Sequence, residues 1–187
     1  MSFYVVDVET AGPIPGHDMY PMLCFAAVKV TDDMDINDPN KTFYGETGPW
    51  DVEKGFSPGS WNKEAAAVSG ISYEEYSKFI HPEITMKRFA GWIEKTNSSH
   101  RPTFISDNVA FDWQFINYYF HYFIGSNPFG WSGRRIGDLY CGQHGDVRCS
   151  WKHLRKTKHT HNPVDDAMGN AEALIRMRDD GLKMDLT

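Results

Sequence analysis

Short apolar runs bounded by turn-forming residues recur in the chain and predict β-strands. They lie at residues 4–10, 23–30, 42–45 and 103–106. Only loops rich in Gly, Pro, Asn and Asp separate the first three, so we expect these strands to form an antiparallel meander. The connection from 50 to 61 contains Gly, Pro, Ser and two tryptophans, which indicates an irregular surface segment.

Apolar residues at helical spacing follow these strands and predict several helices. The helices are expected at 63–68, 73–79, 85–95, 111–123 and from Pro163 onward, with a short one at 151–156 and a strand or helix start at 136–139. The segment 111–123 is so apolar that we expect it to be largely buried. Ser150 is a candidate cap for the short helix and Asn162 for the last one. Strands followed by helices interleaved with single strands indicate an α/β or α+β layered domain with a mixed sheet.

Composition is consistent with one globular domain over residues 1–187, since 41% of the residues are hydrophobic and 14% aromatic. No run reaches the roughly 18 apolar residues of a membrane helix, and the first residues lack a signal-peptide pattern. Three cysteines are too few for a disulfide framework and favour free thiols. We therefore expect a cytoplasmic protein that does not interact with membranes.

The net charge of −6 argues against a nucleic-acid partner, but its distribution is uneven. Between residues 134 and 161, seven Lys or Arg face only Asp138 and Asp146, a local charge of +5. Such a basic segment fits a local phosphate-binding face and fits a solvated helix face equally well.

Two acids occur where a buried strand should carry none. Asp7 and Glu9 are two residues apart, so they point to the same side of the sheet, while Val6 and Val8 point to the other. Close carboxylates repel each other and resist desolvation. The pair is therefore either a divalent metal site or a solvated strand end.

Two predicted helices also begin with an acid. Asp112 lies in the first turn of the helix that follows the strand at 103–106, and Asp166 lies in the first turn of the last helix. The helix dipole alone explains an acid at either place. His161 precedes the last helix, and its pKa near neutrality suits it to take a proton from water.

The order of these residues carries more information than any one of them. Three motifs span residues 5 to 174 and resemble those of the DEDD, or DnaQ-like, 3'-5' exonucleases of the histidine-containing subgroup. The motifs are Asp7-x-Glu9, Asn108-x-x-Phe111-Asp112-x-x-Phe115 and His161-x4-Asp166. Asp138-Leu139 resembles a step that the family has between its second and third motifs.

The resemblance implies a ribonuclease H-like fold, with a five-stranded mixed sheet flanked by helices. It also implies hydrolysis of phosphodiester bonds from the 3' end of single-stranded nucleic acid, with release of nucleoside 5'-monophosphates. Asp7, Glu9, Asp112 and Asp166 would hold two metal ions, and His161 would be the general base. Oxygen ligands favour Mg²⁺ or Mn²⁺ over zinc.

Further residues are candidates for substrate contacts. The resemblance places backbone groups of Thr10 and Ala11 near the terminal nucleotide. Asn108 could orient the second motif from outside the metal shell. Trp61 could stack on a base or pack on the core. The x4 spacing from His161 selects Asp166 over the adjacent Asp165. The chain departs from the family pattern at Asp107, where many relatives have a histidine or small polar residue, and at Ala26-Ala27-Val28, which replaces a frequent Gly-Ala-Val.

Other interpretations stay open at this point. Cys141, His144, Cys149 and His153 are ligand types compatible with structural zinc. The protein could be a zinc-containing or catalytically silent nucleic-acid binding module, or an exonuclease restricted to short oligonucleotides. The sequence does not choose between DNA and RNA, and a homodimer is a further open prediction.

Overall fold

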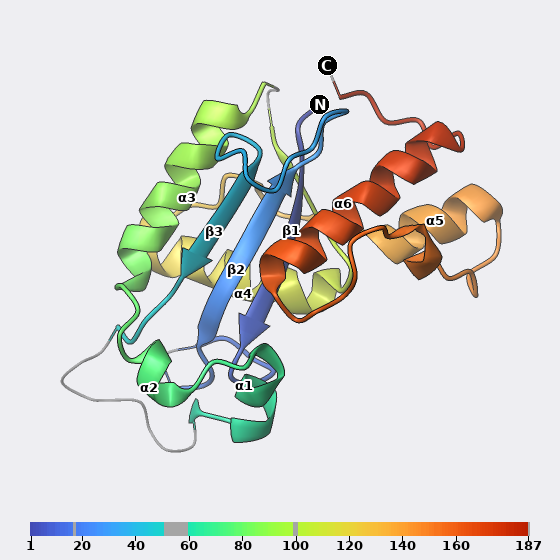
Figure 1. Ribbon diagram of the computed structural model, residues 1–187. Helices are drawn as coiled ribbons and strands as arrows, with labels where there is room; N and C mark the ends of the chain where they lie inside the picture. Colours follow the sequence, from blue (N-terminus) through green and yellow to red (C-terminus); the bar gives the residue numbers. More distant parts are fainter. Residues whose placement is uncertain (17, 51–59, 99–100, 187) are drawn as a thin grey trace.

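The computed structural model describes residues 1–16, 18–50, 60–98 and 101–186, and its centre is one mixed β-sheet (Figure 1). The strands are β1 (Phe3–Thr10), β2 (Met22–Lys29), β3 (Thr42–Glu46), β4 (Thr103–Ser106) and β5 (Gly133–Arg135). Within the described residues they form a five-stranded sheet in the order β3-β2-β1-β4-β5. β1 pairs antiparallel with β2 and parallel with β4, which confirms the predicted meander and the mixed sheet.

Helices cover both faces of the sheet (Figure 1). They are α1 (Lys63–Ser69), α2 (Tyr73–Tyr76), α3 (Pro82–Thr96), α4 (Val109–Ile124), α5 (Ile136–His144) and α6 (Pro163–Asp179), with a short 3₁₀ helix, η2 (Lys152–Leu154). α3 and α4 pack on one face and α6 on the other. α1 and α2 lie at the end of the sheet where β1 finishes. This arrangement confirms the predicted ribonuclease H-like fold class.

The two faces of the sheet have different cores. The face below α3 and α4 is aromatic; Phe89, for example, lies 4.9 Å from Phe25 and 5.4 Å from Phe120 between ring centroids. The face below α6 is built from smaller side chains, including Ala26, Ala167 and other Ala, Val and Met residues. Asp7 and Glu9 belong to this second face, as the strand alternation predicts.

The structure differs in part from the sequence prediction around residues 133–151. β5 begins at the end of a predicted loop. The residues after it begin α5, which confirms the helix start among the two alternatives for 136–139. Three residues are too few to give a strand pattern in the sequence. Ser150 does not cap a helix: η2 follows the buried Trp151 and has no side-chain cap. On α4, Tyr122 is 53% exposed, so this helix is less buried than expected.

Other expectations concern the ends of helices, the cysteines and the long connection. Asn162 caps α6 by accepting a hydrogen bond from the Val164 N–H, with Pro163 at the first position, as predicted. The cysteines are free thiols. The irregular connection predicted at 50–61 lies mostly outside the described residues. Across the described part of the chain, we find no helix with the length and apolarity needed to cross a bilayer.

Candidate active site

The C-terminal end of β1 carries the first two acids of the site. Glu9 pairs with Cys24 on β2, whereas the next residue, Thr10, pairs with Met22, so the ladder has an irregularity between them. Such bulges redirect side chains and are common beside active sites. Glu9 is only 8% exposed, and Asp7 is partly buried one step earlier on the same face.

The third acid comes from the start of α4. β4 runs parallel to β1, so both strands end at the same edge of the sheet, and α4 begins directly after β4. The Asn108 carbonyl accepts the backbone N–H of Asp112 at 3.0 Å, which closes the first turn. Asp112 is 4% exposed and therefore points inward from the helix start.

The fourth acid, Asp166, is in the first turns of α6 and is held by four donors. Its Oδ1 accepts hydrogen bonds from Arg155 (2.9 Å) and from the Thr160 N–H (3.1 Å). Its Oδ2 contacts His159 Nδ1 (2.8 Å) and accepts the His161 N–H (3.0 Å). Asp166 is 1% exposed, whereas the neighbouring Asp165 bonds the Thr160 hydroxyl. The structure thus buries the acid that the x4 spacing selects.

These acids converge. Oxygen atoms of Asp7, Glu9 and Asp166 lie within 4.8 Å of one another. Burial, together with repulsion from Asp166 and Asp112, raises the pKa of Glu9 to about 8. Burial and the charges of Asp112, Glu9 and Asp166 also raise the pKa of Asp7 well above its ordinary value. Such a cluster binds protons tightly when alone, and a cation can take their place.

Asp112 takes part in the same electrostatic group. Burial raises its pKa to about 7, and its charge acts on both Asp7 and Glu9. The four sequence-predicted acids therefore share one environment, although they come from three elements that are far apart in the chain.

A cleft of about 480 Å³ opens above these acids. Asp7, Glu9 and Asp112 line it, together with Thr10, Asn108, His159 and His161. Two of the predicted substrate contacts, Thr10 and Asn108, therefore lie where a ligand could reach them. The cleft also borders α1 through Ala65 and Val68, so this helix forms one of its walls.

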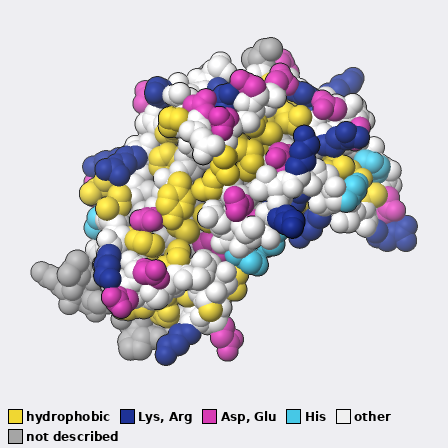
Figure 2. All heavy atoms as spheres, viewed as in Figure 1, with side chains coloured by type: hydrophobic (Ala, Val, Ile, Leu, Met, Phe, Trp, Pro, Cys, Tyr) yellow, Lys and Arg dark blue, Asp and Glu magenta, His cyan; other side chains and the backbone are white. Residues whose placement is uncertain are grey.

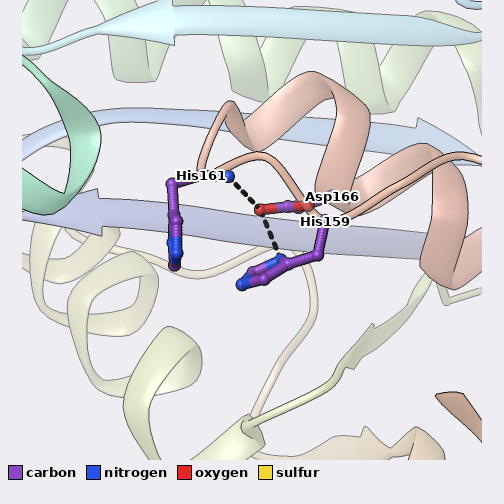
Figure 3. A group of neighbouring side chains, drawn as sticks. All are labelled: His159, His161 and Asp166. Atoms are coloured by element: carbon purple, nitrogen blue, oxygen red, sulfur yellow. Dashed lines mark hydrogen bonds and ion pairs between the residues drawn. The ribbon is translucent and has the colours of Figure 1, made fainter.

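His161 adopts an unusual backbone conformation at the rim of the cleft. Its φ of +60° is in the left-handed region, where residues other than glycine are uncommon and cost about 1–3 kcal/mol. This conformation accompanies the hydrogen bond from the His161 N–H to Asp166, while the side chain is exposed at the cleft. Figure 3 shows the imidazole directed away from that hydrogen bond.

Two residues of the site were missed by the sequence analysis. Arg155 orients Asp166 from the loop after η2, and nothing in the local sequence distinguishes it from the other basic residues nearby. His159 lies with its ring centroid 4.3 Å from that of His161. The left-handed backbone of His161 helps to bring the two rings together, and nothing in the local sequence indicates that conformation.

Two other predicted contacts lie outside the cleft. Ala11 is fully buried; its N–H bonds the Pro21 carbonyl, and its own carbonyl accepts the Asn62 N–H. Both of its backbone groups are thus occupied within the protein. Trp61 packs edge-on to Tyr73 at 5.1 Å and against Tyr76 at 5.3 Å, so the packing interpretation describes it in this structure.

The four residues that could have formed a structural zinc site do not form one cluster of ligands. Within the described residues, two clusters of three potential metal ligands occur, and neither includes Cys141, His144, Cys149 or His153. The structure therefore contradicts a structural zinc site formed by these four residues. Asp107, which departs from the family pattern, forms an ion pair with Lys152 at 3.4 Å and lines the cleft.

Comparisons with known proteins support the fold and the kind of site. No family model matches the chain. The chain is 33% identical over 174 residues to the 3'-5' DNA exonuclease Cap18 of Escherichia coli, covering 92% of this chain and 83% of that protein.

Solved structures give the same fold. The nuclease domain of 3'hExo, a DEDDh family member solved with rAMP, superposes with a TM-score of 0.74 at 15% identity, over 98% of this chain and 94% of that one. A zinc-bound E. coli ExoI–ssDNA complex gives a TM-score of 0.62 at 18% identity, over 97% of this chain and 41% of that one.

The fold is that of the ribonuclease H-like class, and the similarity to a named exonuclease identifies the chain as a nuclease of this class. With the similarity to a 3'-5' exonuclease over nearly its whole length, the chain belongs to the DnaQ-like 3'-5' exonuclease family. It is a 3'-5' exonuclease, and the prediction drawn from the three motifs is confirmed.

Proposed function

We propose that the protein removes nucleotides one at a time from the 3' end of single-stranded DNA and releases nucleoside 5'-monophosphates. The observation that carries this proposal is the convergence of Asp7, Glu9 and Asp166 within 4.8 Å, beside a cleft that Asp7, Glu9 and Asp112 line. DNA is chosen because the 33% identical relative is named a DNA exonuclease.

The acids fit divalent cations. The donor set consists of carboxylate oxygens only, which suits Mg²⁺ or Mn²⁺. Burial, and then repulsion among the acids, raise the pKa values of Glu9 and Asp7 even with Arg155 beside Asp166, so a bound cation would stabilise the charged cluster. Asp7, Glu9, Asp112 and Asp166 would hold two such ions. When bound, these ions supply charge neutralisation, an activated water and stabilisation of the leaving oxygen.

His161 is the proposed general base. Its exposed ring borders the cleft, and its backbone N–H is fixed by Asp166, so the imidazole lies beside the acids without being one of the buried ligands. It would accept a proton from the attacking water, a role that histidine often takes in enzymes. Arg155 keeps Asp166 in position through its 2.9 Å contact.

The remainder of the substrate strand has a route away from the acids. The cleft shares Asp107 and Asn108 with a second cavity of about 800 Å³, which Arg135 and Lys152 also line. Both belong to the segment with a local charge of +5, and Figure 2 shows Lys and Arg gathered on the side that carries α5. We propose that phosphates upstream of the terminal nucleotide lie in this cavity.

The test uses 5'-labelled single-stranded DNA, single-stranded RNA and duplex DNA with Mg²⁺ or Mn²⁺. A ladder that shortens from the 3' end of single-stranded DNA, and that EDTA abolishes, supports the proposal. If RNA were shortened faster than DNA, RNA and not DNA would be the preferred substrate. If only very short oligonucleotides were cleaved, the substrate would be short oligonucleotides and not polymer. If every substrate stayed at full length, the proposal would be wrong.

A histidine pair tests the general base. His161→Ala should lower the turnover rate by a factor of about 10²–10⁴, as loss of a general base does. His144→Ala is the matched control, because this exposed histidine on α5 contacts the Tyr140 carbonyl and is not part of the cleft lining. Equal rates for the two variants would remove His161 from the mechanism.

A further inference from the structure

His159, His161 and Asp166 form a second group of metal-ligating atoms beside the four acids. One ligand atom from each lies within 4.8 Å of the other two (Figure 3). The two imidazole rings are exposed and project to the same side of the segment before α6, with centroids 4.3 Å apart. The carboxylate is buried below them.

The donor chemistry of this group differs from that of the acids. Two imidazole nitrogens and one carboxylate oxygen are ligands that Zn²⁺ binds well, whereas Mg²⁺ prefers oxygen alone. Zinc sites with three protein ligands and one water are common in enzymes. The donor types therefore favour zinc binding at His159, His161 and Asp166 over binding at the cluster of four acids.

The geometry needs only small side-chain movements. Zn–ligand distances of about 2.0–2.1 Å place neighbouring ligand atoms of a tetrahedral site about 3.3 Å apart. His159 Nδ1 already lies 2.8 Å from Asp166 Oδ2, so an ion would replace the proton between them. The exposed rings can rotate without disturbing the core, while Arg155 holds Asp166 through the other oxygen, Oδ1.

The surrounding charge favours a cation at this place. Asp7 and Glu9 line the same cleft as the two histidines and add negative potential. We propose that His159, His161 and Asp166 bind one Zn²⁺ ion, and that this ion inhibits the exonuclease by engaging His161. The binding site stands on the geometry alone, whereas the inhibition rests on the proposed function of His161.

The first experiment measures binding without nucleic acid. Zn²⁺ is titrated into wild-type protein in excess Mg²⁺, in competition with a chromophoric chelator, and one equivalent should bind. His159→Gln removes one ligand and should weaken binding at least about tenfold. His144→Gln is the matched control and should bind as wild type does, since this histidine is exposed on α5.

Three results would overturn the site. The first is no zinc bound in excess Mg²⁺. The second is equal affinity of wild type and His159→Gln, which would place zinc among the acids. The third is loss of binding in His144→Gln, which would place it near Cys141 and Cys149. A zinc anomalous-scattering peak between His159 and His161 in crystals grown with Mg²⁺ and Zn²⁺ would support the site directly.

The second experiment measures inhibition, with each variant compared to its own zinc-free rate. Added Zn²⁺ should slow wild-type and His144→Gln cleavage, and should slow His159→Gln at least about tenfold less effectively. Zinc that binds without slowing cleavage would overturn the inhibitory role. Zinc that binds to a protein without any exonuclease activity would support the site while the proposed function fails, so the two failures are distinguishable.

Discussion

The two faces of β1 differ in what they contribute. The face with Val6 and Val8 packs on α3 and α4 in a core of large aromatic rings, which supplies much of the apolar burial. The other face carries Asp7 and Glu9 toward α6, where burial of charge opposes folding until a cation is bound. One strand therefore stabilises the core with one face and supplies the acids of the candidate site with the other.

The packing of α6 reflects this difference. Its buried positions include Ala167, Ala171 and Ala173, so the helix can approach the sheet closely at these places and carry Asp166 to the acids of β1. Large side chains of the kind found on the opposite face would hold the helix further away. The site thus depends on small side chains between α6 and the sheet, whereas the core on the other face depends on large side chains.

The largest expected effect is on activity, from Asp7→Asn. It should lower the exonuclease rate about 10⁴-fold, equal to about 5.5 kcal/mol in the barrier, because a ligand of the divalent ions is lost. The unfolding free energy in EDTA at neutral pH should stay the same or rise, since a repelled buried charge is removed. Gel assays and denaturant unfolding measure the two quantities.

Asp33→Asn is the control for this variant, because its carboxylate pairs with Lys41 at 2.8 Å on the surface. It should leave the rate unchanged. A strong loss of stability in Asp7→Asn, with activity retained, would reverse the assigned roles of the two faces.

Phe89→Ala tests the opposite face. Removing this buried ring should lower the unfolding free energy by about 3–5 kcal/mol, since a cavity remains among the surrounding rings. The rate per folded molecule should be nearly unchanged. Denaturant melts and rates below the transition measure both, and Phe89→Leu should show a smaller loss. If the activity of Phe89→Ala fell as far as that of Asp7→Asn, the roles of the two faces in stability and in activity would not be separate.

Gly169→Ala tests the close contact between α6 and the loop after η2 that holds Asp166. An added Cβ would lie 2.7 Å from Arg155 Nε and 2.7 Å from the Thr157 carbonyl, so the group that holds Asp166 must move. We expect a loss of about 1–3 kcal/mol in stability and a lower rate. Gly91→Ala on α3 is the matched control, because its Cβ meets no atom within 4 Å, and it should be neutral or stabilising. Equal results for the two variants would contradict the argument.

The smallest effect is the pH dependence of stability without metal. The pKa of Glu9 is raised in the folded protein to about 8 from 4.5, so the folded state binds this proton more tightly than the unfolded state does. Its contribution is therefore favourable below about pH 4.5 and is lost as the pH rises to 8. In EDTA the melting temperature should fall over this range.

The expected fall is at least about 2–4 °C, which corresponds to about 1 kcal/mol at this chain length. Thermal melts with and without Mg²⁺ measure it, and the ion should reduce the slope because it replaces the proton. Glu9→Gln should reduce the slope in EDTA, while the raised pKa values of Asp7 and Asp112 maintain the remainder. A melting temperature that rises steadily with pH in wild type would contradict the burial of charge at Glu9.

Much of the fold could be predicted because its signals are local. The apolar run of β2 and the capped start of α6 are set by neighbouring residues, so a continuous apolar run and a capping pattern identified them. β5 was missed because its three residues are strand only by pairing with β4. Ser150 was misread as a cap because the buried Trp151 decides where η2 begins.

The candidate site divides in the same way. The motif spacing identified Asp7, Glu9, Asp112, Asp166 and His161 without coordinates. Arg155 escaped notice, because an arginine that orients a carboxylate looks like any other basic residue until its partner is known. Ala11 and Trp61 do not line the cleft. Backbone hydrogen bonds to Pro21 and Asn62 occupy Ala11, and Trp61 packs in an aromatic cluster.

By itself, the sequence determined the order of the elements and the types of ligand, because residue spacing fixes which face of a strand or helix a side chain occupies. Only the tertiary structure decided that the acids meet within 4.8 Å and that His159 joins His161 at Asp166. The physical reason is that these distances depend on how closely α6 packs on β1. That approach is a property of the assembled core and of no single segment.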